Sequence, residues 1–128
     1  MTRINFGIEP RELCDQHLVA EYKELPRAFN IVGRSVPGPF RLGTGHVLWC
    51  AQFPGTLADR YRALVHEMRY HGFRVNYPEP RGDGPRATEV QLAAARLLVT
   101  DRIRDRLASM ARAPRWTNRC PPEWAFPP

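Results

Sequence analysis

Apolar side chains recur every three or four positions in three stretches of the chain, and this spacing predicts three amphipathic helices. The apolar positions of the first stretch are Leu18, Tyr22, Leu25, Phe29, Val32 and Val36. Pro10 is suited to a first helical turn, whereas Pro26 lies inside the pattern and should kink the helix or remove a backbone hydrogen bond. We therefore expect one long first helix with a single apolar face.

The two later helices are predicted from their start signals. Thr56 followed by Asp59 resembles a capping box, and Gly72 is a residue type that ends helices. The inward positions of this second helix are Leu57, Tyr61, Leu64, Val65 and Met68. Thr88 with Gln91 resembles the cap of the third helix. Its inward positions are Leu92, Ala95, Val99, Ile103, Leu107 and Met110, and its outer face bears Arg96, Arg102, Arg104 and Arg106.

Proline and glycine gather between these helices, over residues 37–56 and 74–87. Such composition is typical of turn-rich connections, and the first of them encloses a short apolar piece at residues 47–50. Residues 1–7 have extended character and are interpreted as a terminal arm. No stretch alternates as strands do, so we expect an all-α fold: one compact domain over residues 1–128, with three main helices, long Pro/Gly-rich loops and an extended N-terminal arm.

Positive charge is concentrated toward the end of the chain. The 128 residues carry a formal charge of +6, and residues 81–119 hold nine arginines against four acidic residues, 9 − 4 = +5. This excess favours an anionic partner such as nucleic acid, although ordinary solubility would also explain a charged surface. We expect the basic residues of 81–119 to be the electrostatic footprint on a phosphate backbone.

Several classes of protein are disfavoured. No apolar run approaches the roughly 18 residues of a membrane span and the N-terminus lacks a secretory pattern, so we expect a cytoplasmic protein without a membrane partner. Three cysteines without paired spacing suggest neither a disulfide framework nor a zinc site. His66 and His71 are five positions apart, on different helix faces, so we expect no metal.

Two amines are available for covalent chemistry, because Lys23 is the only lysine. At neutral pH roughly a tenth of an α-amine is unprotonated, against about a thousandth of an unperturbed lysine, so the N-terminus is the better nucleophile. Glu24 lies on the first helix among polar and cationic residues, namely Gln16, His17, Lys23 and Arg27. From spacing alone Glu24 is either a functional carboxylate or half of an ordinary surface ion pair.

Four segments resemble the pyrimidine-dimer DNA glycosylases of phages and bacteria. They are Met1-Thr2-Arg3-Ile4-Asn5, Asp15-Gln16-His17-Leu18, Ala20-Glu21-Tyr22-Lys23-Glu24-Leu25-Pro26-Arg27 and Gly43-Thr44-Gly45-His46-Val47. The region of residues 94–97 and the pair Arg115-Trp116 are similar more weakly. The resemblance implies an enzyme that excises the base of a cyclobutane pyrimidine dimer and nicks the strand as an abasic-site lyase.

The resemblance also implies the roles of two catalytic residues. Removal of methionine would leave Thr2 with a free α-amine, which attacks the sugar carbon of the damaged nucleotide and forms a Schiff base. Glu24 would stabilise positive charge on the sugar and assist the proton transfers of β-elimination. No cofactor is implied. The partner is double-stranded DNA with a damaged base or abasic site, bound by a monomer alongside the nucleoid of a bacterium or in a phage-infected cell.

Further positions match DNA contacts of the family. By resemblance these are Arg3, Gln16, His17, Tyr22, Lys23, Arg27, His46 and Trp116. His46 is alternatively a histidine at the edge of the core, and Trp116 alternatively packs the tail on the core. Two departures, a shorter loop before Gly43 and a divergent tail after Trp116, leave open the same mechanism on another modified base. A non-catalytic basic DNA-binding module would explain the arginines but not Thr2 together with Glu24.

Overall fold

The structure, a computed structural model, describes residues 4–31, 46–76 and 84–126, and every regular element in these ranges is helical. The α-helices are α1 (Asp15–Asn30), α2 (His46–Cys50), α3 (Pro54–Tyr70) and α4 (Glu89–Ser109), and two short 3-10 helices are η1 (Pro10–Glu12) and η3 (Glu123–Ala125). The all-α prediction with three main helices is confirmed. The short apolar piece expected in the first connection forms α2.

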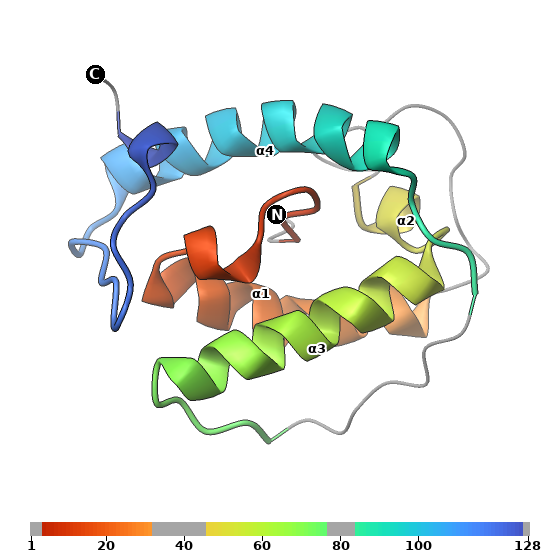
Figure 1. Cartoon of the computed structure of the whole chain (residues 1–128), viewed down its shortest axis with the longest axis horizontal. Coiled ribbons are helices and arrows are strands. Elements are labelled where there is room, and N and C mark those ends of the chain that lie inside the picture. Colours follow the sequence, from red (N-terminus) through yellow and green to blue (C-terminus); the bar gives the residue numbers. More distant parts are fainter. Residues whose placement is uncertain (1–3, 32–45, 77–83, 127–128) are drawn as a thin grey trace.

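The N-terminal segment, residues 4–8, lies between the helices. Figure 1 shows it with α4 on one side and with α1 and α3 on the other. Ile4, Phe6 and Ile8 are at most 1% exposed, and the Phe6 ring meets Trp49 edge-on with the ring centroids 6.2 Å apart. Burial of each such side chain contributes about 1.5 to 3 kcal/mol. The expectation of a terminal arm is therefore wrong for residues 4–7, which form part of the core.

Helix α1 follows the predicted apolar stripe but is shorter than expected. Leu18, Tyr22 and Leu25 are buried against the core, and Pro26 is accommodated within the last turns. The helix ends at Asn30. The predicted continuation through Val32 and Val36 lies outside the described residues. Pro10 stands in η1, a separate turn before α1, so the prediction of one long first helix is wrong at its start.

The start of α3 differs from its prediction. The helix begins at Pro54, because proline is preorganised for the first helical position, and Phe53 precedes it as the cap residue. Thr56 does not cap α3. Its hydroxyl accepts a hydrogen bond from the Ala87 backbone N–H at 2.7 Å, across to the segment before α4. The predicted end is confirmed, since Gly72 follows the helix with a φ of +86°.

Helix α4 begins as predicted. The Gln91 N–H donates to the Thr88 hydroxyl at 3.1 Å, and the Thr88 N–H donates to the Gln91 side chain at 2.8 Å, which completes the capping box. The middle of the predicted apolar stripe is buried, at Ala95, Val99, Ile103 and Leu107.

The arginines assigned to the outer face of α4 do not all face solvent, and that prediction is wrong for three of them. Arg96 pairs with Glu12, and Arg102 donates to the Ile4 carbonyl at 2.7 Å. Arg104 pairs with Asp101 and reaches the Trp124 carbonyl at 3.4 Å. Arg96 and Arg102 donate to backbone carbonyls of the N-terminal segment that α4 covers, and Arg104 donates to a carbonyl of the tail, because long guanidinium side chains can supply these donors.

Candidate active site

One face of α1 lines an open cleft of about 1060 Å³. The residues contributed by α1 are Asp15, Gln16, Val19, Ala20, Lys23 and Glu24, which recur at helical spacing along a single face. The opposite wall comes from Phe73 and from residues 112–115 of the C-terminal tail. The cleft therefore lies between a helix and a tail segment that are about a hundred residues apart in sequence.

Glu24 is the carboxylate of this cleft farthest along α1. Its side chain is 21% exposed and accepts a hydrogen bond from the Arg27 guanidinium at 3.3 Å, while Arg27 is 67% exposed. Lys23, also on the cleft wall, is exposed. An exposed pair of this kind contributes at most about 1 kcal/mol to stability, so Glu24 is available to a ligand at little structural cost.

The first turn of α1 holds the tail wall in place. The Gln16 side-chain amide donates to the Ala113 carbonyl at 2.9 Å and accepts from the Arg115 N–H at 3.0 Å. The Asp15 N–H donates to the Arg115 carbonyl at 2.7 Å. The Asp15 carboxylate accepts from the Thr117 N–H at 3.0 Å and from its hydroxyl. We call this set of hydrogen bonds the tail clamp.

A buried histidine directly after α3 supports the tail clamp. Both ring nitrogens of His71 lie against carboxylates, Nδ1 at 2.7 Å from Asp15 and Nε2 at 2.8 Å from Glu67. Arg119 of the tail binds the same Glu67 carboxylate through two nitrogens at 2.8 and 2.9 Å. Burial raises the pKa of Asp15, but the hydrogen bonds from Thr117 and His71 outweigh burial and leave the pKa below its ordinary value.

The N-terminal segment is anchored immediately after Arg3. The Ile4 carbonyl accepts from His46 Nε2 at 2.8 Å and from Arg102 at 2.7 Å. The Asn5 amide donates to Glu21 of α1 at 2.8 Å. Glu21 is fully buried and also binds Arg60 of α3. These contacts fix where the chain leaves the core relative to α1.

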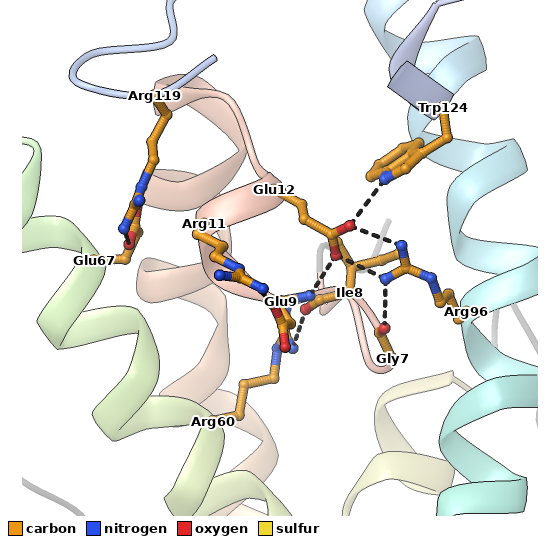
Figure 2. Close-up of polar contacts among 10 residues, drawn as sticks. All are labelled: Gly7, Ile8, Glu9, Arg11, Glu12, Arg60, Glu67, Arg96, Arg119 and Trp124. Carbon is orange, nitrogen blue, oxygen red and sulfur yellow. Dashed lines mark hydrogen bonds and ion pairs between the residues drawn. The ribbon is translucent and has the colours of Figure 1, made fainter. Parts of the chain in front are cut away.

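A second anchor joins the N-terminal segment to α4 and the tail (Figure 2). Glu12 accepts two hydrogen bonds from Arg96 at 2.7 Å each and one from the Trp124 indole at 3.0 Å. Arg96 also donates to the Gly7 carbonyl at 3.2 Å. Burial raises the pKa of Glu12, yet the hydrogen bonds from Arg96, Trp124 and the Glu9 N–H prevail and lower it to about 2.

A family model described as pyrimidine dimer DNA glycosylase matches residues 1–79 of the chain. The chain belongs to this family. The match spans the N-terminal segment, α1, α2 and α3, and so contains Glu24 and the α1 wall of the cleft. The family relationship makes the protein a DNA glycosylase by class, with DNA as the substrate. The tail wall, at residues 112–115, lies beyond the matched residues.

The structure brings together part of the set expected in this glycosylase. Gln16, Lys23 and Glu24 line the cleft, and Arg27 binds Glu24. His17 is half-buried at the start of the same helix. Thr2 and Arg3 lie outside the described residues, so the predictions made for them stay predictions.

Three other expected DNA contacts have different surroundings. His46 is fully buried, which favours the interpretation of this histidine as a core residue. Tyr22 is 4% exposed, and its hydroxyl accepts from the Asn76 N–H at 3.0 Å. Trp116 is half-buried and its ring lies edge-on to Phe126, with centroids 6.3 Å apart. Direct contact with DNA would require Tyr22 and His46 to leave their packed positions.

The sequence analysis did not predict that Glu21, Arg60 and Arg102 anchor the N-terminal segment. The sequence does indicate that Glu21 is buried, because it follows Leu18 by three positions and precedes Leu25 by four, on the inward face of α1. A charged residue at an inward position requires a buried partner. The identity of the partners, Arg60 and Asn5, depends on the packing of distant segments.

The remaining negative predictions concern metals and membranes. Within residues 4–31, 46–76 and 84–126, no cluster of three or more histidine, cysteine or acidic side chains is arranged to hold a metal ion. In the same part of the chain, no helix combines the length and apolar character needed to cross a bilayer.

Proposed function

We propose that this protein excises damaged pyrimidines and cleaves the resulting abasic site, using the α-amine of Thr2 as nucleophile and Glu24 as the acid–base carboxylate. The observation that carries the proposal is the position of Glu24 in a cleft within a chain of the pyrimidine dimer DNA glycosylase family. Further support comes from the hydrogen bonds that anchor the chain at Ile4 and Asn5, close to Thr2. The only lysine of the chain is Lys23, so few other amines are available.

The proposed reaction begins at the sugar of the damaged nucleotide. The Thr2 nitrogen forms a bond to C1′ while the bond from C1′ to the base breaks and the base leaves with the electron pair. Positive charge develops on the sugar ring as this bond breaks, and the Glu24 carboxylate is suited to stabilise it. Proton transfer to the ring oxygen then opens the sugar and gives a protonated imine.

Strand cleavage follows from the imine. The imine acidifies the C2′ proton, Glu24 accepts that proton, and the bond between C3′ and its phosphate oxygen breaks by β-elimination. Water then hydrolyses the imine and releases the amine of Thr2. Each step uses groups of the chain, the DNA and water.

The N-terminal anchors restrict where the amine is delivered. The three residues from Thr2 to Ile4 reach at most about 10 Å, so the amine of a productive Thr2 must act within that distance of the anchored Ile4 carbonyl. Ile4 is held by His46 and Arg102, and the adjacent Asn5 is held by Glu21, one turn before Glu24 on α1. This arrangement favours delivery of the amine beside α1.

A second candidate keeps the mechanism and changes the base that is removed. The observation that favours it is that the family match ends at residue 79, so the tail wall of the cleft falls outside the matched residues. Lesion preference depends on groups that meet the damaged bases, and a different tail gives a different preference. The catalytic residues would be unchanged.

Strand cleavage of three matched duplexes tests the proposal. One carries a cyclobutane pyrimidine dimer, one an abasic site, and one is undamaged. We expect cleavage at the dimer and at the abasic site and none in the undamaged duplex. Cleavage of the abasic duplex alone would favour another base as the target. Binding without cleavage of any duplex would identify a non-catalytic DNA-binding module.

A further inference from the structure

The two arginines of the tail wall differ from four other arginines of the C-terminal third. Arg112 and Arg115 are exposed and line the cleft, and neither forms an ion pair with a carboxylate of the described residues. By contrast, described arginines of this third that bind a carboxylate are Arg86 with Asp59, Arg96 with Glu12, Arg104 with Asp101 and Arg119 with Glu67. Unpaired cations in a concave site are suited to an anionic ligand.

The backbone around Arg115 is held on both sides. Its N–H donates to Gln16, its carbonyl accepts from the Asp15 N–H, and Thr117 binds the Asp15 carboxylate. The tail clamp therefore fixes the backbone from Ala113 to Thr117 against the first turn of α1. A guanidinium that extends from a fixed backbone loses less freedom when it binds than one on a free tail.

We propose that Arg112 and Arg115 bind backbone phosphates of the damaged strand, and that Gln16 is a positioning residue for Arg115. The inference rests on the proposed function, because a sugar presented to Glu24 carries a phosphate on either side. The α1 wall of the cleft offers Glu24 and Lys23, and the tail wall offers two guanidiniums. Guanidinium and phosphate form paired, charge-assisted hydrogen bonds.

Gln16 acts on DNA through the tail in this account. Its nitrogen donates to Ala113 and its oxygen accepts from Arg115, so both polar ends of the amide are already engaged. If Gln16 instead touched DNA directly, its contribution to binding would be independent of Arg115. A double-mutant cycle separates the two cases, because residues that act through one another give non-additive effects.

Binding of an abasic-site duplex at several salt concentrations tests the two arginines. Each phosphate that an arginine no longer neutralises should make the slope of log affinity against log salt shallower by about 0.9. We expect the change in slope for the R112A/R115A protein to be close to twice this value. At low salt its affinity for the duplex should fall on the order of tenfold for each arginine removed. Because both side chains are exposed, the melting temperature should stay at the wild-type value.

The matched control is Arg11→Ala, which removes one exposed arginine that binds Glu9 and does not line the cleft. This variant should keep the wild-type salt slope. For the cycle, Gln16→Ala should weaken binding in the wild-type background and have little further effect once Arg115 is alanine.

Two outcomes would overturn the inference. A wild-type salt slope in the R112A/R115A protein would show that the tail wall does not bind phosphate. Additive effects of Gln16→Ala and Arg115→Ala would show that Gln16 does not act by positioning the tail. The proposed function is tested separately by the wild-type protein: if it cleaves abasic DNA while the double variant binds normally, only the inference about the tail fails.

Discussion

The Glu12 network should make stability depend on pH in a way that Glu12→Gln removes. Glu12 is 17% exposed and is bound by Arg96, Trp124 and the Glu9 N–H. A pKa of about 2, against 4.5 for the free group, corresponds to a ceiling of about 3 kcal/mol at neutral pH. Partial screening by solvent reduces the expected loss in the variant to about 2 kcal/mol.

The sign of the pH effect follows from the lowered pKa. A carboxylate whose pKa is depressed on folding contributes its full stability above the unfolded value, near pH 4.5, and loses it as the pH falls toward 2. The wild-type protein should therefore be more stable than Glu12→Gln at pH 7, and the difference should shrink between pH 4.5 and pH 2. Urea unfolding of both proteins at each pH measures it.

Glu9→Gln is the matched control for this experiment. Glu9 adjoins η1, and its carboxylate binds Arg11 in a pair of which both side chains are at least 60% exposed. Such a pair contributes at most about 1 kcal/mol, so the free energy of unfolding of this variant should remain close to that of the wild type. Equal losses in Glu9→Gln and Glu12→Gln, or a loss in Glu12→Gln that is the same at pH 7 and pH 2.5, would refute the role assigned to the Glu12 network.

Two further predictions concern the catalytic carboxylate and the N-terminal segment. Glu24→Gln should lower the rate of base excision by a factor of about 10² to 10⁴. The free energy of unfolding should change by less than about 1 kcal/mol. A rate loss below tenfold, with unchanged DNA binding, would show that Glu24 is only a surface ion-pair partner. Gly7→Ala should destabilise the fold by more than Gly72→Ala in thermal unfolding. Both glycines have a φ of +86°, which costs an alanine about 1 to 2 kcal/mol, but only at Gly7 would the new Cβ lie 2.4 Å from a backbone oxygen, that of Leu92. Equal losses of thermal stability in Gly7→Ala and Gly72→Ala would mean that α4 can move away from the N-terminal segment at no cost.

Local patterns were sufficient for the helices and insufficient for what lies between them. Leu18 and Leu25 on α1 and the Thr88 cap of α4 were predicted because their signals span only a few residues. The partner of the Ile4 carbonyl is Arg102, 98 positions away, and no local periodicity in the sequence indicates such a partner. Arginines that bind backbone carbonyls look in sequence like a charged surface, which is why the prediction for part of α4 was wrong.

For the candidate site, too, local patterns predicted the residues on the helix and not those that reach it from distant segments. Spacing placed Glu24 among polar and cationic residues of the first helix, Lys23 included, and the structure adds that Lys23 and Glu24 line a cleft. The tail wall was not predicted, because its position depends on hydrogen bonds from Asp15 and Gln16 to residues about 100 positions away. Basic composition pointed to the C-terminal third, and only the structure separates arginines that bind carboxylates from those that face the cleft.

The central claim is that the amine of Thr2 is the nucleophile, and reductive trapping tests it most directly. Borohydride added during reaction with abasic DNA reduces the imine and leaves a stable covalent complex. Digestion after glutamate separates the two possible sites, because Thr2 and Lys23 fall in different peptides. We expect the adduct on the α-amine of Thr2. The Lys23→Arg variant, which lacks the only lysine, should still form the covalent complex with DNA. Protein whose α-amine is acetylated should form none. An adduct on Lys23, or trapping that survives acetylation of the N-terminus, would contradict the account.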